Sequence, residues 1–121
     1  VHAIGTNAAK NEHDPFTQKY IFPGSTTPKL SVLAKHIEAR NMAIVDVENV
    51  VRHYALTVRR WLEAFRANAT TLDVERYDER FRRMWEYYLS CGIAVALAGD
   101  LAVYQVLFTK DYYADLAYRR I

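Results

Sequence analysis

The sequence predicts an α/β fold in a single domain, mostly helical, with two or three strands. Its 121 residues match the usual size of one domain. Apolar residues make up 51% of the chain and charged residues 25%, a balance that is typical of globular proteins. Segments with helical periodicity alternate with short apolar runs, and this order favours a small sheet covered by helices.

The segment 1–29 is expected to form a loop, because proline and glycine recur in it and favour turns. These residues stand at Gly5, Asp14-Pro15, Phe22-Pro23-Gly24 and Pro28.

A helix and then a strand are expected over residues 30–47. The helical spacing is carried by Leu30, Leu33, Ala34 and Ile37, and Asn41 is a suitable stop. The run from Met42 to Val47 is rich in branched side chains, which suits a strand.

A pair of helices is expected over residues 52–98. From Tyr54 to Phe65, apolar side chains recur at the spacing of an amphipathic helix, with arginines on the other face. Residues 68–73 break this pattern, with Thr70 and Thr71 as candidates for a helix cap. The same spacing resumes at Tyr77 and continues to the end of the pair.

The last strand is expected over residues 101–109. Its side chains are apolar on both alternating faces from Leu101 to Phe108, as in a strand that is covered on both sides. We therefore expect this strand in the interior of the sheet.

Composition excludes several classes of function. A net charge of +2 is too small to indicate a nucleic-acid partner. The single Cys91 forms no internal disulfide and no zinc site, so a reducing, cytoplasmic setting is expected. The longest apolar stretch, Cys91 to Ala98, is far shorter than the roughly 20 residues that cross a bilayer. The chain opens without an initiator Met or a signal region, so we expect it to begin inside a longer protein.

Several phrases stand in a fixed order along the chain. They are His2-Ala3-Ile4-Gly5, the segment Asp14 to Gly24, Asp46-Val47-Glu48-Asn49, His53-Tyr54, the segments Tyr77 to Phe81 and Met84 to Leu89, and Gly99-Asp100-Leu101 before Gln105. Together they resemble the C-terminal half of cyclopropane-fatty-acyl-phospholipid synthases, over nearly the whole chain up to about Lys110.

The resemblance implies that residues 1–121 are the C-terminal fragment of one methyltransferase domain with a Rossmann-like, class I fold that uses S-adenosylmethionine. Residues 1–2 would then leave the fifth strand of the sheet, residues 42–47 would be the sixth strand and residues 101–108 the seventh. The helical pair would be the family's insertion, a lid around an acyl pocket. The four glycines of the chain offer no counterpart to the glycine-rich turn that grips the cofactor. The cofactor site is therefore expected mostly outside this chain, and the fragment alone is expected to be inactive.

The resemblance also implies a chemistry. In this family a cis double bond of a phospholipid acyl chain attacks the sulfonium methyl, and a bicarbonate ion removes a proton from the new methyl so that the ring closes. His2 matches the imidazole ligand of that ion, Ile4 supplies a backbone N–H, and Tyr54 matches the hydroxyl ligand. Tyr87 and Tyr88 are candidates for the lining of the acyl pocket. Each of these tyrosines has an alternative role in ordinary helix packing, and His2 has one as a terminal residue.

Three departures from the family pattern leave the acyl substrate and the product open. Ser25 to Lys29 replaces the usual continuation of the Phe-Pro-Gly phrase. Cys91 stands one position earlier than the family's helix cysteine, about 100° around the helix axis. Ile93 replaces an acidic residue.

Two other functions remain open at this stage. Amine N-methyltransferases share the Phe-Pro-Gly and His-Tyr phrases. A non-enzymatic helical module that binds nucleic acid through its arginines is disfavoured by the acidic residues in the same stretch. The expected partners are phospholipid acyl chains at a membrane surface, with no nucleic acid, and a second copy of the chain through self-association or homodimer formation. The expected location is cytoplasmic, peripheral to the inner membrane.

Overall fold

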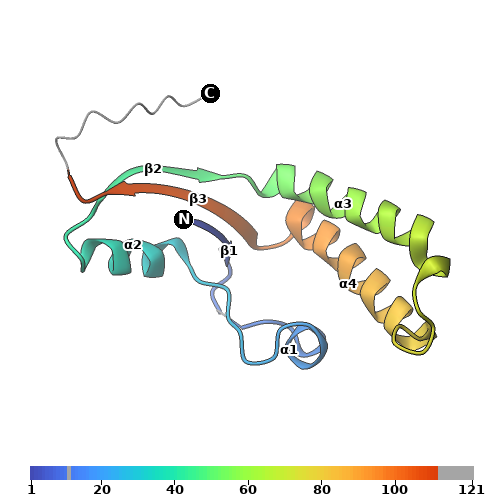
Figure 1. Ribbon diagram of the computed structural model, residues 1–121. Coiled ribbons are helices and arrows are strands. Elements are labelled where there is room, and N and C mark those ends of the chain that lie inside the picture. The colour runs from blue at the N-terminus through green and yellow to red at the C-terminus, as the bar shows by residue number, and fades with distance from the viewer. Residues whose placement is uncertain (11, 112–121) are drawn as a thin grey trace.

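The computed structural model describes residues 1–10 and 12–111, and Figure 1 shows their arrangement. In chain order the elements are β1 (His2–Thr6), α1 (Pro15–Tyr20), α2 (Leu30–Glu38), β2 (Ala43–Asn49), α3 (Val51–Asn68), a 3-10 turn (Ala69–Thr71), α4 (Glu79–Ala98) and β3 (Leu101–Thr109). The mixed fold class, the helix and strand expected over residues 30–47 and the helical pair agree with the sequence prediction, although β2 continues to Asn49.

The sheet has three strands in the order β1-β3-β2, and both outer strands run antiparallel to β3. His2 and Glu48 face Gln105 from its two sides in the register of the sheet. A register shift interrupts the β2 ladder between Ile44 and Asp46. The central position of β3 confirms the prediction drawn from its apolar faces.

The loop predicted for residues 1–29 is wrong at its beginning, where β1 forms. Pairing with β3 makes this segment a strand, and β3 lies about a hundred positions later in the chain. The local residue preferences of a segment contain no information about such a distant partner. Gly5 supports close packing in β1, since a Cβ there would lie 2.5 Å from the Pro28 carbonyl oxygen and 2.7 Å from the Tyr104 ring.

The loop prediction is also wrong at α1, which begins at the Asp14-Pro15 pair. One carboxylate oxygen of Asp14 accepts hydrogen bonds from the backbone N–H groups of Phe16 (3.0 Å) and Thr17 (3.1 Å). Pro15 occupies the first helical turn, where its missing N–H costs no hydrogen bond. The pair that suggests a turn is therefore a helix start.

The connection between α3 and α4 differs from the sequence prediction in its cap. Asp78 caps α4 by accepting a hydrogen bond from the Phe81 N–H (2.7 Å), whereas Thr70 and Thr71 lie in the 3-10 turn. An aspartate at this position satisfies one of the free N–H groups of the first turn.

Two hydrophobic clusters hold the molecule together. The sheet cluster consists of Ile37 on α2 and Ala102, Tyr104 and Val106 on β3. The helix cluster consists of Val58 and Leu62 on α3 and Leu89 on α4. In Figure 1, α2 lies against the sheet and the α3–α4 pair extends from the end of the sheet where β3 begins. The chain therefore has a sheet region and a helical region with separate cores.

Candidate functional site

A cavity of about 460 Å³ lies where β1, the α1 segment, α3 and α4 meet. We call it the tyrosine cavity, because the phenols of Tyr54 and Tyr88 line it. Its apolar lining includes Ile4, Phe22, Val95 and Leu101, and its polar lining includes Glu12, His13, Asp14, Thr17 and Cys91. Such a mixture of apolar surface and a few polar groups is typical of ligand pockets.

The two phenols of the cavity are protonated at neutral pH. Tyr54 lies in the first turn of α3, and its ring contacts Trp61 edge-on with 6.1 Å between ring centroids. Burial raises the pKa of Tyr54. Burial and, after it, the neighbouring Tyr54 phenol raise the pKa of Tyr88. Both hydroxyls therefore carry a proton that they can donate to an anion or to a polar substrate atom.

The backbone of Ile4 offers a further donor. The Val1 amino group donates to the Val106 carbonyl (2.7 Å), and the Val106 N–H donates to the Val1 carbonyl (2.7 Å). Val1 and Val106 are therefore a hydrogen-bonded pair of the antiparallel ladder. In such a ladder, residues whose N–H points toward the partner strand alternate with residues whose N–H points away from it. The N–H groups of His2 and Ile4 therefore point away from β3. The Thr6 N–H, two positions further, confirms this alternation by donating to Pro28 outside the sheet (3.2 Å).

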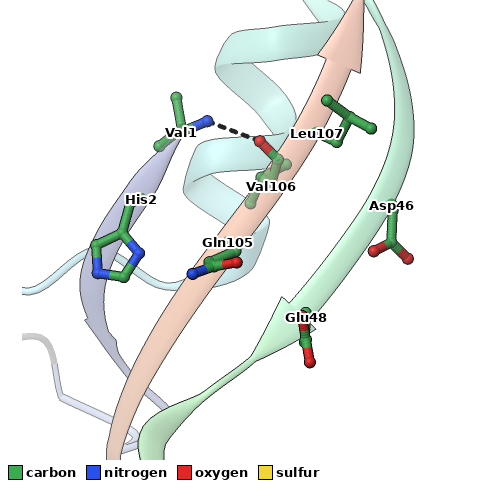
Figure 2. A pocket seen from close by; sticks show the side chains of 7 residues that line it. All are labelled: Val1, His2, Asp46, Glu48, Gln105, Val106 and Leu107. Atoms are coloured by element: carbon green, nitrogen blue, oxygen red, sulfur yellow. Dashed lines mark hydrogen bonds between the residues drawn. The ribbon is translucent and has the colours of Figure 1, made fainter. Parts of the chain in front are cut away.

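His2 lines a second, smaller cavity of about 360 Å³. Figure 2 shows His2 beside Gln105 on β3, with Glu48 and Asp46 beyond it on β2. His2 shares a face of β1 with Ile4, since alternate side chains of a strand point to the same side. The structure thus brings Ile4 and Tyr54 to one cavity and places His2 in the neighbouring one.

The two adjacent candidates on α4 have different surroundings. Tyr88 lines the tyrosine cavity and contacts Phe22 edge-on (5.9 Å). Tyr87 is 55% exposed, lies outside this cavity and contacts Phe16 of α1 edge-on (4.8 Å). Adjacent residues of a helix point about 100° apart, which separates the two phenols.

A sequence profile described as mycolic acid cyclopropane synthetase matches residues 1–106. The chain belongs to this family. Cyclopropane-fatty-acyl-phospholipid synthase of Escherichia coli (strain K12) is 32% identical over 110 residues, which make up 91% of this chain and 28% of that relative. Tuberculostearic acid methyltransferase UfaA1 of Mycobacterium tuberculosis is 40% identical over 98 residues, covering 78% of this chain and 22% of the relative.

Solved structures of the cyclopropane synthetase family share the fold of this chain. Mycolic acid cyclopropane synthase CmaA1, complexed with SAH and CTAB, matches with a TM-score of 0.76 at 20% identity, over 88% of this chain and 42% of that chain. The fold is therefore that of one part of a Rossmann-like methyltransferase, as the resemblance implied. The chain spans about a quarter of the length of the curated relatives that it matches.

The described residues do not fit a site for S-adenosylmethionine. Such a site in this fold needs a glycine-rich turn between a strand and the start of a helix. Gly5 lies within β1, Gly92 lies inside α4 and Gly99 follows the end of α4. Gly24 has a positive φ of 75° in the turn after α1. None of these glycines opens a helix after a strand.

The rim that α1 contributes to the tyrosine cavity was missed by the sequence analysis. His13, Asp14 and Phe22 line the cavity from this segment. The available signal was Asp14-Pro15, which is a helix start as well as a turn signal. Cys91 also lines the cavity, although it stands one position earlier than the family's helix cysteine. Among residues 1–10 and 12–111, no group of three or more His, Cys, Asp or Glu side chains could hold a metal ion.

Proposed function

We propose that this chain is the substrate-binding, C-terminal part of a methyltransferase that transfers the methyl group of S-adenosylmethionine to a cis double bond of a phospholipid acyl chain. The observation that carries the proposal is the tyrosine cavity, where an apolar lining adjoins two protonated phenols. An acyl chain requires the apolar lining, and the reaction requires donors that fix a small polar group beside it.

The proposed product is a cyclopropane or a related methylated acyl chain. The names of the relatives described above refer to a cyclopropane-fatty-acyl-phospholipid and to tuberculostearic acid, so they favour a lipid over a small amine as the acceptor. The acceptor distinguishes this proposal from an amine N-methyltransferase, and assays with both classes of substrate separate them.

We further propose that the base is a bicarbonate ion held by the Tyr54 hydroxyl and the Ile4 N–H, with the His2 imidazole completing the site from the neighbouring cavity on the same face of β1. Two features support this assignment. The Tyr54 phenol keeps its proton, and the Ile4 N–H points away from β3 at the edge of the sheet. A bound bicarbonate would accept the proton that the new methyl group loses when the ring closes. Donors fixed in a water-poor cavity hold an anion more strongly than water does.

The methyl donor would bind mostly outside these residues, because the glycines of the chain do not form the glycine-rich turn that its site needs. The family member CmaA1 is complexed with SAH, the demethylated form of S-adenosylmethionine, which supports this cofactor for the whole protein. We therefore propose that residues 1–121 alone bind S-adenosylmethionine weakly and are inactive. Calorimetric titration of the isolated chain tests this, and micromolar binding would contradict it.

The proposed partner is a phospholipid surface on the cytoplasmic side of the inner membrane. No helix within the described ranges is long and apolar enough to span a bilayer. Three aromatic side chains near the cavity are exposed, Tyr20 (42%), Phe22 (44%) and Tyr87 (55%). Lys19 and Arg80 lie close enough to Tyr20 to lower its pKa, Lys19 having the larger effect. Aromatic rings beside basic groups suit the interface of an anionic membrane.

In isolation, residues 1–121 have a second copy of the chain as another proposed partner. β1 lies at one edge of the described sheet, and edge strands offer backbone groups for pairing with another chain. Light scattering tests this proposal, which a monomer at high concentration would contradict.

Tyr54→Phe in the complete protein tests the proposed function. Loss of one hydrogen bond to a buried anion costs about 1.5–3 kcal/mol, which is about a ten- to over a hundredfold loss of turnover. Added bicarbonate should partly restore turnover of unsaturated phospholipid vesicles, and binding of S-adenosylmethionine should stay the same. His2→Gln should show the same pattern.

Tyr77→Phe is the matched control, because Tyr77 contacts Phe81 (5.0 Å) at the start of α4 and does not line the cavity. Equal turnover of Tyr54→Phe and Tyr77→Phe at every bicarbonate concentration would remove Tyr54 from the site.

A further inference from the structure

At the end of β2, a side-chain oxygen replaces a backbone carbonyl as a hydrogen-bond acceptor, and this replacement links the sheet to α3. Asn49 is the last residue of β2, and α3 begins at Val51. Between them, the Val50 N–H donates to the Val103 carbonyl on β3 (2.8 Å). In an antiparallel ladder such a pair of residues exchanges two bonds, so the Val103 N–H would normally donate to the Val50 carbonyl.

The side chain of Asn49 takes the place of that carbonyl. The Val103 N–H donates to the Asn49 side-chain oxygen (3.1 Å), and the Val50 carbonyl instead accepts the N–H of Tyr54 (3.0 Å). The latter bond belongs to the first turn of α3. The same Asn49 oxygen also accepts the Val51 N–H (3.2 Å). One side-chain oxygen thus completes the β2–β3 ladder and frees a carbonyl to start the helix.

The position requires an acceptor with the geometry of asparagine or aspartate. Val103 is completely buried, so its N–H would lose its partner and gain no water if the oxygen were removed. Short side chains with an oxygen on Cγ reach backbone N–H groups one or two residues away, which is why they favour such turns. Asn49 itself does not line the tyrosine cavity.

We propose that Asn49 is a positioning residue for Tyr54, because it fixes the first turn of α3 on the sheet and thereby the place of the Tyr54 phenol in the tyrosine cavity. The effect on the reaction rests on the proposed function, whereas the effect on the phenol does not. Without the Asn49 oxygen, the Val103 N–H and the Tyr54 N–H compete for the Val50 carbonyl. The turn that carries Tyr54 then loosens while the rest of α3 stays packed against α4.

The experiment compares Asn49→Ala with Asn49→Asp and Asn68→Ala in the complete protein. Asn49→Asp keeps an acceptor oxygen. Asn68→Ala removes an asparagine from the other end of α3, where its amide donates to the Ala64 carbonyl (2.8 Å). The readouts are hydrogen exchange of the Val103 and Tyr54 amides, difference titration of the Tyr54 phenol and the bicarbonate dependence of turnover. Far-UV circular dichroism reports whether each variant folds.

For Asn49→Ala we expect exchange of both amides to accelerate about tenfold or more, since a buried N–H has lost its partner. The Tyr54 phenol should ionise at lower pH than in the wild type, because it becomes more exposed. The half-saturating bicarbonate concentration should rise while that of S-adenosylmethionine stays constant. Asn49→Asp should resemble the wild type in all readouts, and Asn68→Ala should accelerate exchange only near the end of α3.

Three results would overturn the proposal. The first is unchanged exchange at Val103 in Asn49→Ala. The second is that Asn49→Asp differs from the wild type in these readouts as much as Asn49→Ala does. If Asn49→Ala does not fold, the same result for Asn49→Asp alone would overturn the proposal. The third is accelerated exchange with an unchanged Tyr54 titration, which would make Asn49 purely structural. If Tyr54→Phe is fully active, the proposed role of Tyr54 at the bicarbonate fails, and the exchange and titration still test the positioning of Tyr54.

Discussion

The sheet region and the helical region are built from contacts of different range. In the sheet, β3 pairs with β1, and Val1 just before β1 bonds to Val106, which is 105 positions later. In the helical region, α3 and α4 follow each other along the chain and bury Val58, Leu62 and Leu89 between them. The candidate phenols extend this helix cluster, because Tyr54 and Tyr88 pack against it as well as lining the cavity. The comparison indicates that residues which stabilise the helical region also form the candidate site, whereas the core residues of the sheet region do so far less.

Truncation of one core residue in each region should have the largest effect and tests this comparison directly. Leu89→Ala and Ile37→Ala each remove a buried side chain and should lower the free energy of unfolding by about 2–5 kcal/mol. Leu89→Ala should reduce hydrogen-exchange protection in α3 and α4 and lower turnover of unsaturated phospholipid. Ile37→Ala should reduce protection in α2 and the sheet, with turnover of the folded fraction near that of the wild type. Equal loss of protection in both regions for either variant would show that the two cores unfold as one unit.

An intermediate effect is expected at the cap of α1, which joins the two regions at the rim of the cavity. The Thr17 hydroxyl and, after it, the backbone N–H groups of Thr17 and Phe16 lower the pKa of Asp14. Asp14→Ala should therefore weaken α1 by about 1 kcal/mol at neutral pH. Because the pKa in the folded state lies below that of the unfolded chain, the contribution is complete above the ordinary value of 3.8 and is lost as the pH falls through the folded value.

The measurement is hydrogen exchange of the Phe16 and Thr17 amides at neutral and at low pH, corrected for intrinsic rates. Asp14→Asn is the matched variant, since asparagine caps helices without titrating. It should protect α1 equally at both pH values. A difference between the wild type and Asp14→Ala that persists at the lowest pH would rule out the carboxylate as the cause.

The smallest effect is expected at the ion pair that joins the two helices on their exposed side. The Arg66 guanidinium donates to the Glu86 carboxylate (2.7 Å), and the two side chains are 57% and 43% exposed. Glu86→Gln should cost about 0.2–1 kcal/mol, and salt should reduce the difference from the wild type. Glu79→Gln is the control, because Glu79 pairs with Arg83 within α4 and does not connect the helices. Urea unfolding at low and high salt measures both, and a cost in Glu86→Gln that salt leaves unchanged would contradict a screened surface pair.

Much of the fold and part of the site could be predicted from local patterns. Amphipathic spacing predicted the helical pair, because the buried face of a helix repeats every three to four residues whatever it packs against. The apolar run of β3 predicted a central strand for a similar reason. Resemblance added Ile4 and Tyr54, which the structure brings to one cavity. Their roles at the proposed anion remain predictions.

What the sequence by itself determined are the features that a short window contains: the fold class, the amphipathic helices, the central strand and the family phrases. The resemblance placed the end of a strand at residues 1–2, whereas the tertiary structure decided that the strand runs over residues 2–6, because their pairing partners lie on β3. It also decided that Tyr88 lines the cavity while Tyr87 points elsewhere, and that the Asn49 oxygen replaces a backbone carbonyl on Val103. Each of these depends on a partner from a distant part of the chain, and hydrogen bonds and cavity walls exist only once the chain has brought both sides together.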